Sequence, residues 1–210
     1  MTTKNVLIIK SSPAASHSVS NEMADYFMSQ LQEKDVNYRF QVRDLALTPA
    51  PMYSPEILNA FYTPLDQLTQ EQERISAPSL TYIEEIKTAD LIVIASPMHN
   101  FSITSLLKTY LDQICRMGLT FKYSEAGPEG LIKDKQAIII ASAGGDFLSE
   151  ENKHKDFQAP YLNHVLNFIG IEDVERVSVH KLGFGDEIAK QMKQEAKHQL
   201  AQLATHTISV

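Results

Sequence analysis

Apolar residues in this chain are concentrated in five short runs, which are separated by longer segments with helical periodicity. In the run over 91–95, apolar side chains follow one another without polar alternation, which is typical of a parallel strand buried on both faces. The other runs have similar lengths, and together they predict a five-stranded sheet. The predicted strands are 6–10, 38–43, 91–95, 136–141 and 174–179.

The segments around these runs carry apolar residues at intervals of three and four, as amphipathic helices do. Alternating strands and helices predict an α/β fold with a doubly wound parallel sheet and helices on both faces. The residues that mark the helices are Met23, Tyr26, Phe27 and Leu31, then Leu80, Ile83 and Ile86, then Leu107, Tyr110, Leu111 and Ile114, then Tyr161, Val165, Phe168 and Ile169, and finally Ile188, Met192, Ala196, Leu200 and Leu203.

Two segments exceed what a five-stranded sheet needs. The first, 48–78, is rich in proline and aromatic residues, and the second, 121–135, contains turn residues at Gly127, Pro128 and Gly130. Inserted segments of this kind serve more often as lids or subunit contacts than as independent domains. We therefore expect a single domain over 1–210 with insertions near 48–78 and 121–135.

Composition narrows the classes of function. A formal net charge of -7 argues against non-specific nucleic-acid binding, which needs a concentrated basic face. No segment has the roughly 18 consecutive apolar residues of a membrane span, and residues 1–5 lack the features of a signal peptide. With one cysteine, Cys115, no intramolecular disulfide can form. We expect a cytoplasmic protein that binds neither nucleic acid nor membranes.

The first predicted strand leads into a serine-rich segment, residues 11–20, which we call the serine loop. Ser18 or Ser20 suits the N-cap of the following helix, and an acidic residue such as Glu22 suits its first turn. Serines are common in caps whatever the function, but hydroxyls beside free helix amides also bind a phosphate monoester. Neither a Walker motif nor GxGxxG is present, which disfavours a nucleoside triphosphate or a dinucleotide. A mononucleotide with one terminal phosphate fits best.

Two further loops follow predicted strands. The aromatic loop, residues 97–101, consists of Pro97, Met98, His99, Asn100 and Phe101 and would offer a wall to a flat aromatic ligand. The glycine loop, residues 142–146, contains Ser142, Ala143, Gly144 and Gly145. Adjacent glycines allow a close approach of the backbone to a ligand, although for these glycines taken alone a tight turn is the favoured explanation.

The strand order 2-1-3-4-5, common among doubly wound sheets, would bring the three loops together. It places the carboxyl ends of strands one, three and four side by side, where open α/β sheets bind ligands. One phosphate site and two ring-facing loops would then line a single crevice.

These residues resemble the FMN-dependent NADH-azoreductase family of bacteria, flavodoxin-like homodimers that also act as NAD(P)H:quinone oxidoreductases. The resemblance covers nearly the whole length, and the order and spacing of its segments are more specific than any one of them. The segments that carry it are 6–12, 18–21, 97–101, 121–123, 127–131, 142–145, 160–162 and 168–171.

The resemblance implies a set of cofactor-binding residues. Ser12, Ser18, Val19 and Ser20 would hold the FMN phosphate. Pro97, Met98, His99, Asn100 and Phe101 would flank the isoalloxazine together with Ser142, Ala143, Gly144 and Gly145.

Two of these positions depart from the family pattern. His99 stands where tyrosine is usual, and Ala143 where some members have a larger residue. Main-chain contacts tolerate both changes, so we expect them to alter substrate preference more than FMN binding.

The mechanism implied by the resemblance is a ping-pong reduction by NADH or NADPH, in which quinones take one hydride and azo compounds two. Amides of Asn100 and of Gly144 or Gly145 would stabilise negative charge on the reduced ring. No catalytic side chain is required, although His99 is a candidate proton donor. The histidines lack metal-ligand spacing, so no metal is expected, and Cys115 is expected to be a small core residue.

Two other classes of function remain open from sequence alone. Flavodoxin-type electron carriers share the architecture and carry single electrons without using a nicotinamide nucleotide, but they are usually shorter, more acidic and without the long insertions. A regulatory module that has lost flavin is the third class, and the intact serine, aromatic and glycine loops argue against it.

Overall fold

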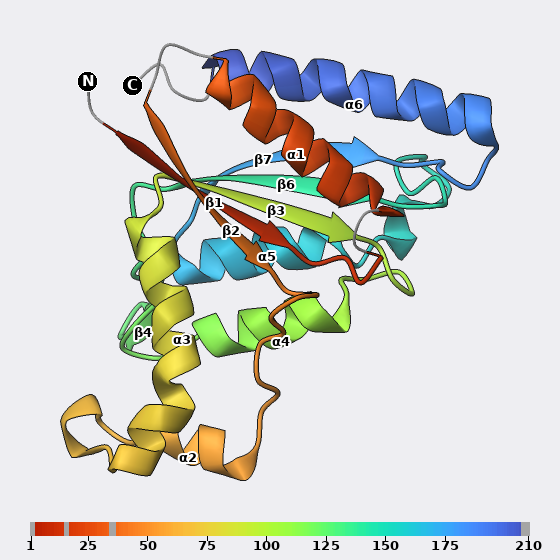
Figure 1. Ribbon diagram of the computed structural model, residues 1–210. Coiled ribbons are helices and arrows are strands. Elements are labelled where there is room, and N and C mark those ends of the chain that lie inside the picture. The colour runs from red at the N-terminus through yellow and green to blue at the C-terminus, as the bar shows by residue number, and fades with distance from the viewer. Residues whose placement is uncertain (1–2, 15–16, 34–36, 207–210) are drawn as a thin grey trace.

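The computed structural model describes residues 3–14, 17–33 and 37–206 of the chain. Five parallel strands form one sheet in the order β2-β1-β3-β6-β7, and two short strands form a separate antiparallel hairpin (Figure 1). The sheet strands are β1 Lys4–Lys10, β2 Tyr38–Asp44, β3 Leu91–Pro97, β6 Gln136–Ser142 and β7 Asp173–Val179. The predicted fold class, strand positions and strand order are confirmed.

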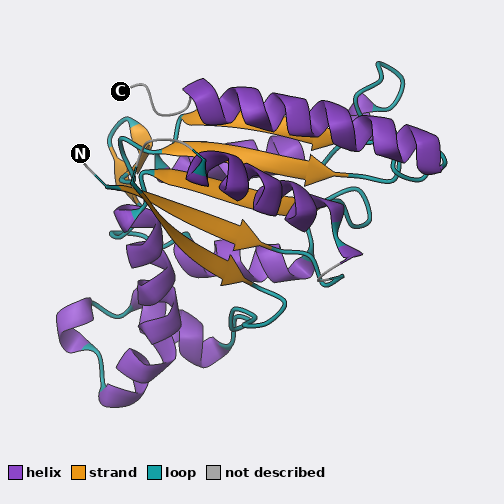
Figure 2. Cartoon of the chain, turned by 45° about the horizontal axis from the view of Figure 1, so that its top comes forward, coloured by secondary structure: helices purple, strands orange, loops and turns teal. Residues whose placement is uncertain are grey.

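Helices cover both faces of the sheet (Figures 1 and 2). Helices α1 and α6 lie on one face, and α3, α4 and α5 lie on the other. The helices are α1 Val19–Gln32, α2 Pro55–Tyr62, α3 Gln70–Thr88, α4 Ser105–Ile114, α5 Ala159–Ile169 and α6 Asp186–His206. All five helices expected from the apolar periodicity are present, and α2 is additional.

The core is divided by the sheet into two clusters of buried apolar side chains. Along β1, Leu7 and Ile9 belong to the cluster under α3, α4 and α5, whereas Val6 and Ile8 belong to the cluster under α1 and α6. All four side chains are at most 1% exposed. Because successive side chains point to opposite faces of a strand and both faces are buried, the sequence of β1 shows no polar alternation.

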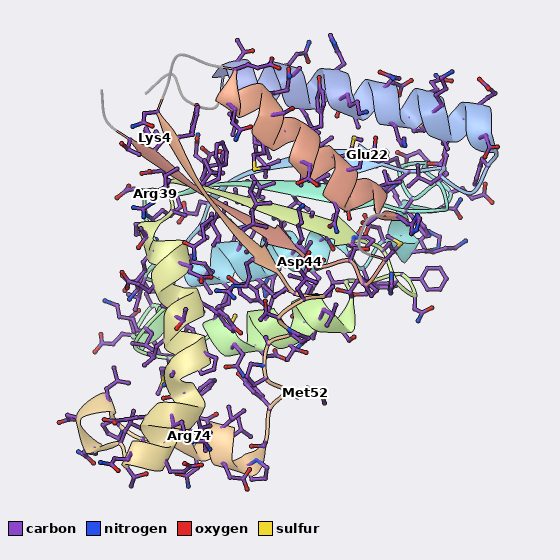
Figure 3. The ribbon with its side chains drawn as sticks, viewed as in Figure 1. Lys4, Glu22, Arg39, Asp44, Met52 and Arg74 are labelled. Carbon is purple, nitrogen blue, oxygen red and sulfur yellow. The ribbon has the colours of Figure 1, made fainter. Side chains whose placement is uncertain are left out.

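The insertion predicted over 48–78 forms an arm that extends away from the sheet. It contains α2, a 3-10 turn at Leu65–Gln67 and the first turns of α3 (Figure 1). Met52 lies on the segment that leads from the sheet to α2, and Arg74 lies near the far end of the arm (Figure 3). Pro78, expected to end the insertion, lies inside α3, which begins eight residues earlier with a capping box between Thr69 and Gln72.

Arg116 anchors the arm to the rest of the domain. It is 4% exposed, its guanidinium lies 4.0 Å from the centre of the Phe61 ring, and its Nη1 donates to Ser79 Oγ at 3.3 Å. Burial lowers the pKa of this guanidinium. The arginine therefore contacts both α2 and α3 and fixes their position against the end of α4 through a cation–π contact and a hydrogen bond.

The second insertion forms a hairpin of β4 Phe121–Ser124 and β5 Gly127–Gly130. Gly130, expected in a turn, ends β5 and lies directly against Gly170, the left-handed C-cap of α5. A Cβ atom at position 130 would lie 2.2 Å from the Gly170 nitrogen, so the hairpin can approach α5 only because both residues lack side chains.

We predict that Gly130→Ala destabilises the protein by about 3 kcal/mol, because its Cβ would overlap backbone atoms that cannot move aside. Urea unfolding followed by circular dichroism measures this change. Gly127→Ala is the matched control in the same hairpin, since nothing lies within 4 Å of its Cβ position and only its positive φ is strained. An equal loss in the two variants would contradict the proposed close contact.

Candidate functional site

The serine, aromatic and glycine loops meet at the carboxyl edge of the sheet, where the arrowheads of the strands end (Figure 2). Ser11 donates from its amide and its hydroxyl to the carbonyl of Ala95, at 3.1 and 2.8 Å. The amide of Met98 donates to the Ser142 carbonyl at 2.7 Å. Main-chain hydrogen bonds therefore connect the ends of β1, β3 and β6 and bring the three loops together, as the strand order predicts.

The serine loop ends in a well-formed helix N-cap at Ser18, one of the two residues predicted for this role. Its hydroxyl accepts from the Asn21 amide at 3.3 Å and lies 3.1 Å from the hydroxyl of Ser20. Val19 and Ser20 begin α1, and Glu22 is acidic in the first turn. Two hydroxyls at the positive end of a helix dipole form a suitable cradle for a phosphate group.

Ser12 lies at the other end of the serine loop. It is 2% exposed, and its hydroxyl accepts from the Ala14 amide at 3.3 Å. The neighbouring Ser11 hydroxyl is occupied by Ala95, which gives Ser11 a structural role. Ser16, part of the predicted serine-rich segment, lies outside the described residues.

The aromatic loop reverses the chain in a tight turn. His99 and Ser102 exchange main-chain hydrogen bonds of 2.8 and 3.0 Å, and the two residues between them have positive φ values, 48° for Asn100 and 71° for Phe101. Asparagine tolerates this conformation, but a bulky side chain such as phenylalanine is strained in it, at a cost on the order of 1–3 kcal/mol. The Phe101 side chain is 52% exposed.

Strain at an exposed aromatic residue favours a role in ligand contact, because packing does not account for it. The Phe101 carbonyl accepts from the Phe157 amide at 2.9 Å, and its ring meets the Phe147 ring edge-on at 6.0 Å. Both contacts hold the strained residue in place. His99, the candidate proton donor, has an exposed side chain in the same turn.

The glycine loop is hydrogen-bonded to the end of β7 and to the segment that follows it. Residues 143–145 and 179–183 exchange four main-chain hydrogen bonds of 2.8 to 3.2 Å. Ala143 is 4% exposed and faces the interior, whereas Gly144 is exposed. Lys181 also pairs with Asp146 at 3.1 Å, so the loop is fixed in position although it contains two adjacent glycines.

Both ring-facing loops contain main-chain amides without a recorded acceptor. Among the residues that the structure describes, no acceptor is recorded for the amides of Asn100, Phe101, Gly144 and Gly145. Preorganised N–H groups of this kind stabilise negative charge on a bound ligand without further reorganisation. The arrangement can therefore bind a phosphate at one end and an electron-rich planar ring at the other.

Several residues that support this edge were not predicted from the sequence. Thr104 connects two of the loops, since its hydroxyl donates to the Ser11 carbonyl at 2.9 Å and accepts from the Leu107 amide at 3.2 Å. Phe147 and Phe157 follow the glycine loop and support Phe101, but no sequence periodicity predicts these contacts. The one available signal was the position of Phe147, an aromatic residue directly after the glycine loop.

The mixed charge run over 150–156, which follows the glycine loop, is mostly exposed except at its end. Asp156 is 7% exposed. Its Oδ1 accepts from the amides of Gln158 and Ala159 at 2.9 and 3.1 Å, and its Oδ2 pairs with Arg176 at 3.0 Å. The Asp156 carboxylate is therefore held at the N-terminus of α5 and does not face solvent.

Cys115 is confirmed as a packing residue. It follows α4, lies partly buried against the core cluster, and has a thiol whose pKa burial raises to about 11. The thiol is therefore protonated at neutral pH and is a poor nucleophile. Within the described ranges, no group of three His, Cys, Asp or Glu residues is arranged to hold a metal ion.

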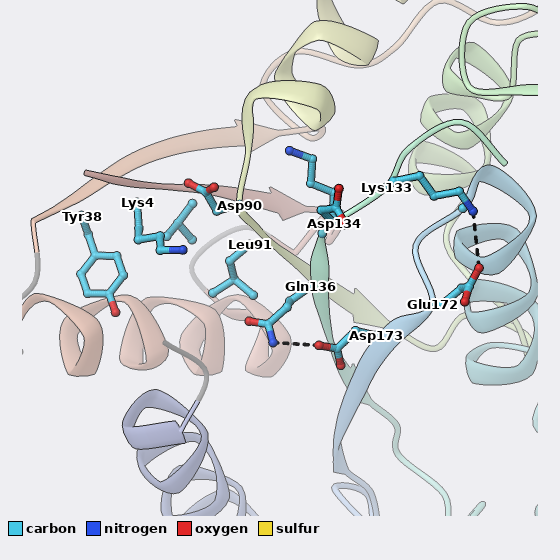
Figure 4. A pocket seen from close by; sticks show the side chains of 12 residues that line it. Lys4, Tyr38, Asp90, Leu91, Lys133, Asp134, Gln136, Glu172 and Asp173 are labelled. Carbon is cyan, nitrogen blue, oxygen red and sulfur yellow. Dashed lines mark hydrogen bonds and ion pairs between the residues drawn. The ribbon is translucent and has the colours of Figure 1, made fainter. Parts of the chain in front are cut away.

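A cavity of about 580 Å³ lies at the opposite, amino edge of the sheet, lined by the first residues of β1, β3, β6 and β7. Four of its polar side chains form two pairs: Gln136 donates to Asp173 at 2.7 Å, and Lys133 and Glu172 lie 3.5 Å apart (Figure 4). Asp90 accepts from the Asn5 amide at 2.7 Å. Because these groups already have partners, the carboxyl edge is the better candidate site.

An open, doubly wound parallel sheet in the order β2-β1-β3-β6-β7, with its loops gathered at the carboxyl edge, is the architecture of flavodoxin-type proteins. The chain belongs to the flavodoxin-like fold family, whose sequence model matches residues 4–204. No helix among the described residues is long and apolar enough to cross a membrane.

Curated relatives cover almost the whole chain. It is 44% identical over 191 residues to the FMN-dependent NADH:quinone oxidoreductase of Hydrogenovibrio crunogenus, which covers 90% of this chain and 94% of the relative. It is 42% identical over 198 residues to the protein of the same name from Yersinia pestis (strain Pestoides F), with 94% and 97% covered.

Solved structures show the same similarity. An FMN-dependent NADH-azoreductase from Bacillus anthracis (strain Ames Ancestor), in complex with FMN, superposes with a TM-score of 0.85 at 27% identity, covering 96% of this chain and 99% of that one. An azoreductase from Bacillus anthracis (strain Sterne) gives a TM-score of 0.87 at 25% identity, with 96% and 98% covered.

We predict that Thr104→Val lowers the free energy of unfolding by about 1–3 kcal/mol, because the change leaves the buried Ser11 carbonyl and Leu107 amide without a partner while keeping the side-chain shape. Chemical denaturation measures the loss. The control is Thr109→Val in the same helix. The exposed Thr109 hydroxyl donates to the Ser105 carbonyl at 2.8 Å, and its loss should lower the free energy of unfolding by less than about 0.5 kcal/mol. Equal effects would rule out a special role for the link between loops.

Proposed function

We propose that the protein is an FMN-dependent oxidoreductase that uses NADH to reduce quinones and to cleave aromatic azo compounds. The observation that carries the proposal is the meeting, at one sheet edge, of a serine-capped helix N-terminus with two loops of free amides and an exposed aromatic ring. The names of the relatives, which specify FMN, NADH and quinone or azo chemistry, support it.

The polar groups present fit the phosphate and the ring of FMN in their hydrogen-bonding chemistry. The hydroxyls of Ser12, Ser18 and Ser20, with the first amides of α1 at Val19, would hold the phosphate. The ring would lie between the aromatic loop, Pro97 to Phe101, and the glycine loop, Ser142 to Gly145. Within these loops, Met98 and Ser142 are already joined by a main-chain hydrogen bond, which holds the two loops next to each other.

When bound, FMN supplies hydride transfer between a reduced nicotinamide nucleotide and an acceptor, and we infer that the two substrates use the same face in turn, a ping-pong order. The amides of Asn100, Gly144 and Gly145 would stabilise negative charge on the ring system. The Phe101 ring would form one wall of the substrate space and exclude water from it. Solvent or His99 would provide the proton that completes quinone reduction.

Three finer points stay predictions. NADPH is the alternative reductant, a homodimer is the expected assembly, and the cytoplasm is the expected location. Steady-state kinetics with both nucleotides and light scattering of the purified protein address the first two. A homodimer would explain exposed apolar side chains around the site, such as Phe157 and Phe184, which are 61% and 54% exposed.

We predict that the FMN-reconstituted protein bleaches on anaerobic addition of NADH and regains its absorption bands on addition of a benzoquinone. An absorption spectrum recorded after each addition measures this. A bound flavin that ignores both nicotinamide nucleotides would instead indicate a flavodoxin-type electron carrier, and a chain that binds no flavin would refute the interpretation of all three loops.

A second prediction concerns the phosphate cradle. Ser18→Ala should weaken FMN binding about tenfold, which corresponds to the loss of one charge-assisted hydrogen bond of roughly 1.5 kcal/mol. Fluorescence titration of the apoprotein with FMN gives the dissociation constant. Ser54→Ala is the matched control, because Ser54 caps α2 in the same way, by accepting from the Ile57 amide, but lies on the arm.

The cap loss should reduce the stability of both serine variants by about 1 kcal/mol. Only the Ser18 variant should bind FMN more weakly. Unchanged FMN affinity in Ser18→Ala would remove this residue from the proposed cradle.

A further inference from the structure

Phe147 connects the glycine loop to the strained Phe101. Its ring meets the Phe101 ring edge-on at 6.0 Å and 87°, and it meets the His180 ring in the same way at 6.0 Å and 88°. It also folds back over Gly145, where a Cβ atom would lie 2.9 Å from the Phe147 ring. The orientation of Phe101 therefore depends on a ring that is itself held by His180 and by the absence of a side chain at position 145.

His180 holds the main chain of Phe147 as well as its ring. It follows the last strand, β7, is 1% exposed, and accepts the Phe147 amide proton at its Nδ1 with a distance of 3.3 Å. In the described part of the chain, its Nε2 has no hydrogen-bond partner. An Nδ1 atom can accept only when it carries no proton, so this geometry requires a neutral imidazole protonated on Nε2.

Charged groups around His180 are arranged in two ion pairs. Asp146 of the glycine loop pairs with Lys181, and Asp156 pairs with Arg176 of β7, at 3.1 and 3.0 Å. Burial, followed by the charge of Arg176, lowers the pKa of His180 below its ordinary 6.5, while Asp156 and Asp146 act in the opposite direction. The net shift keeps the ring neutral at physiological pH, and protonation becomes favourable only on the acid side.

We propose that His180 and Phe147 are positioning residues for quinone reduction, which through this chain of contacts set the orientation of the Phe101 ring and require a neutral His180. The proposal rests on the proposed function, because it assumes that Phe101 borders the substrate space. Neither residue touches the substrate. Their effect passes through the position of the Phe101 ring, which in turn determines how closely a flat acceptor can lie against the crevice.

A role in packing alone would predict something different. A buried histidine that only filled space would be replaceable by any side chain of similar volume, and pH would affect it only through global unfolding. A positioning role needs an acceptor at the Nδ1 position. Asparagine offers an oxygen close to that position and does not titrate, whereas leucine offers a similar volume and no acceptor.

The test compares wild type with His180→Asn, His180→Leu and the control His198→Asn, since His198 is exposed on α6 and belongs to none of the loops of the candidate site. The kcat/KM for a benzoquinone is measured with NADH between pH 5 and pH 8. Below the pKa of His180, the wild type and the control should lose up to tenfold in kcat/KM for each pH unit. His180→Asn should not show this fall in kcat/KM at acid pH (the acid limb), and at pH 8 it should retain most of the wild-type kcat/KM.

His180→Leu should show a kcat/KM about tenfold lower than wild type at pH 8 and no loss from His180 titration at acid pH, because the Phe147 amide is left without an acceptor and leucine does not titrate. FMN affinity, measured at pH 8, should change little in any variant. An acid limb that persists unchanged in His180→Asn, or full activity of His180→Leu, would overturn the proposal while leaving the proposed function intact.

A readout independent of flavin comes from ¹⁵N NMR of the imidazole nitrogens and of the Phe147 amide in the apoprotein. We expect His180 to be neutral with the proton on Nε2 at pH 7, and the Phe147 amide to shift as His180 titrates below pH 6.5. Two results would refute the proposed coupling between His180 and Phe147: a charged His180 at pH 7, or a Phe147 amide whose chemical shift does not change as His180 titrates. Failure of the wild type to bind FMN at all would refute the proposed function and, with it, the role in catalysis.

Discussion

Continuous main-chain hydrogen bonding past the ends of the parallel strands is the constraint on which the candidate site depends. Ser11 bonds to Ala95, Met98 to Ser142, and Ala143 to Val179, so each connection starts where a strand ends. These bonds continue the register of β1, β3, β6 and β7 into the loops. As a result, loops that contain glycines, serines and a strained turn are nevertheless held in fixed positions relative to one another.

The strands and most helices were predictable because burial on both faces leaves a simple pattern in the sequence. The run at 91–95 could be assigned to a strand buried on both faces because its apolar residues do not alternate with polar ones, and it is β3 in the middle of the sheet. The start of α3 was harder to predict. Pro78 suggests a break, but the helix begins before it, fixed by the capping box at Thr69 and the contact of Arg116 with α2 and α3.

The candidate site was predictable in its loops and not in its supports. Asn100 and Gly144 could be predicted from their positions just after strands, and Ser18 from its position before a helix; the structure places their loops together. The supports, Thr104, Phe147 and His180, act through contacts between segments that are distant in sequence. Such contacts depend on the path of the loops after the strands end, and a single sequence carries no periodicity that specifies that path.

The backbone conformation of Phe101 has a consequence for how this protein balances stability against activity. At a φ of 71°, selection for stability alone would favour glycine or asparagine, which adopt this region at little cost. A half-exposed phenylalanine contributes little core packing to offset the strain. With phenylalanine at position 101, the folded state is therefore less stable than it would be with glycine or asparagine on the same backbone. Such a loss of stability is expected where a side chain is retained for its contact with a ligand.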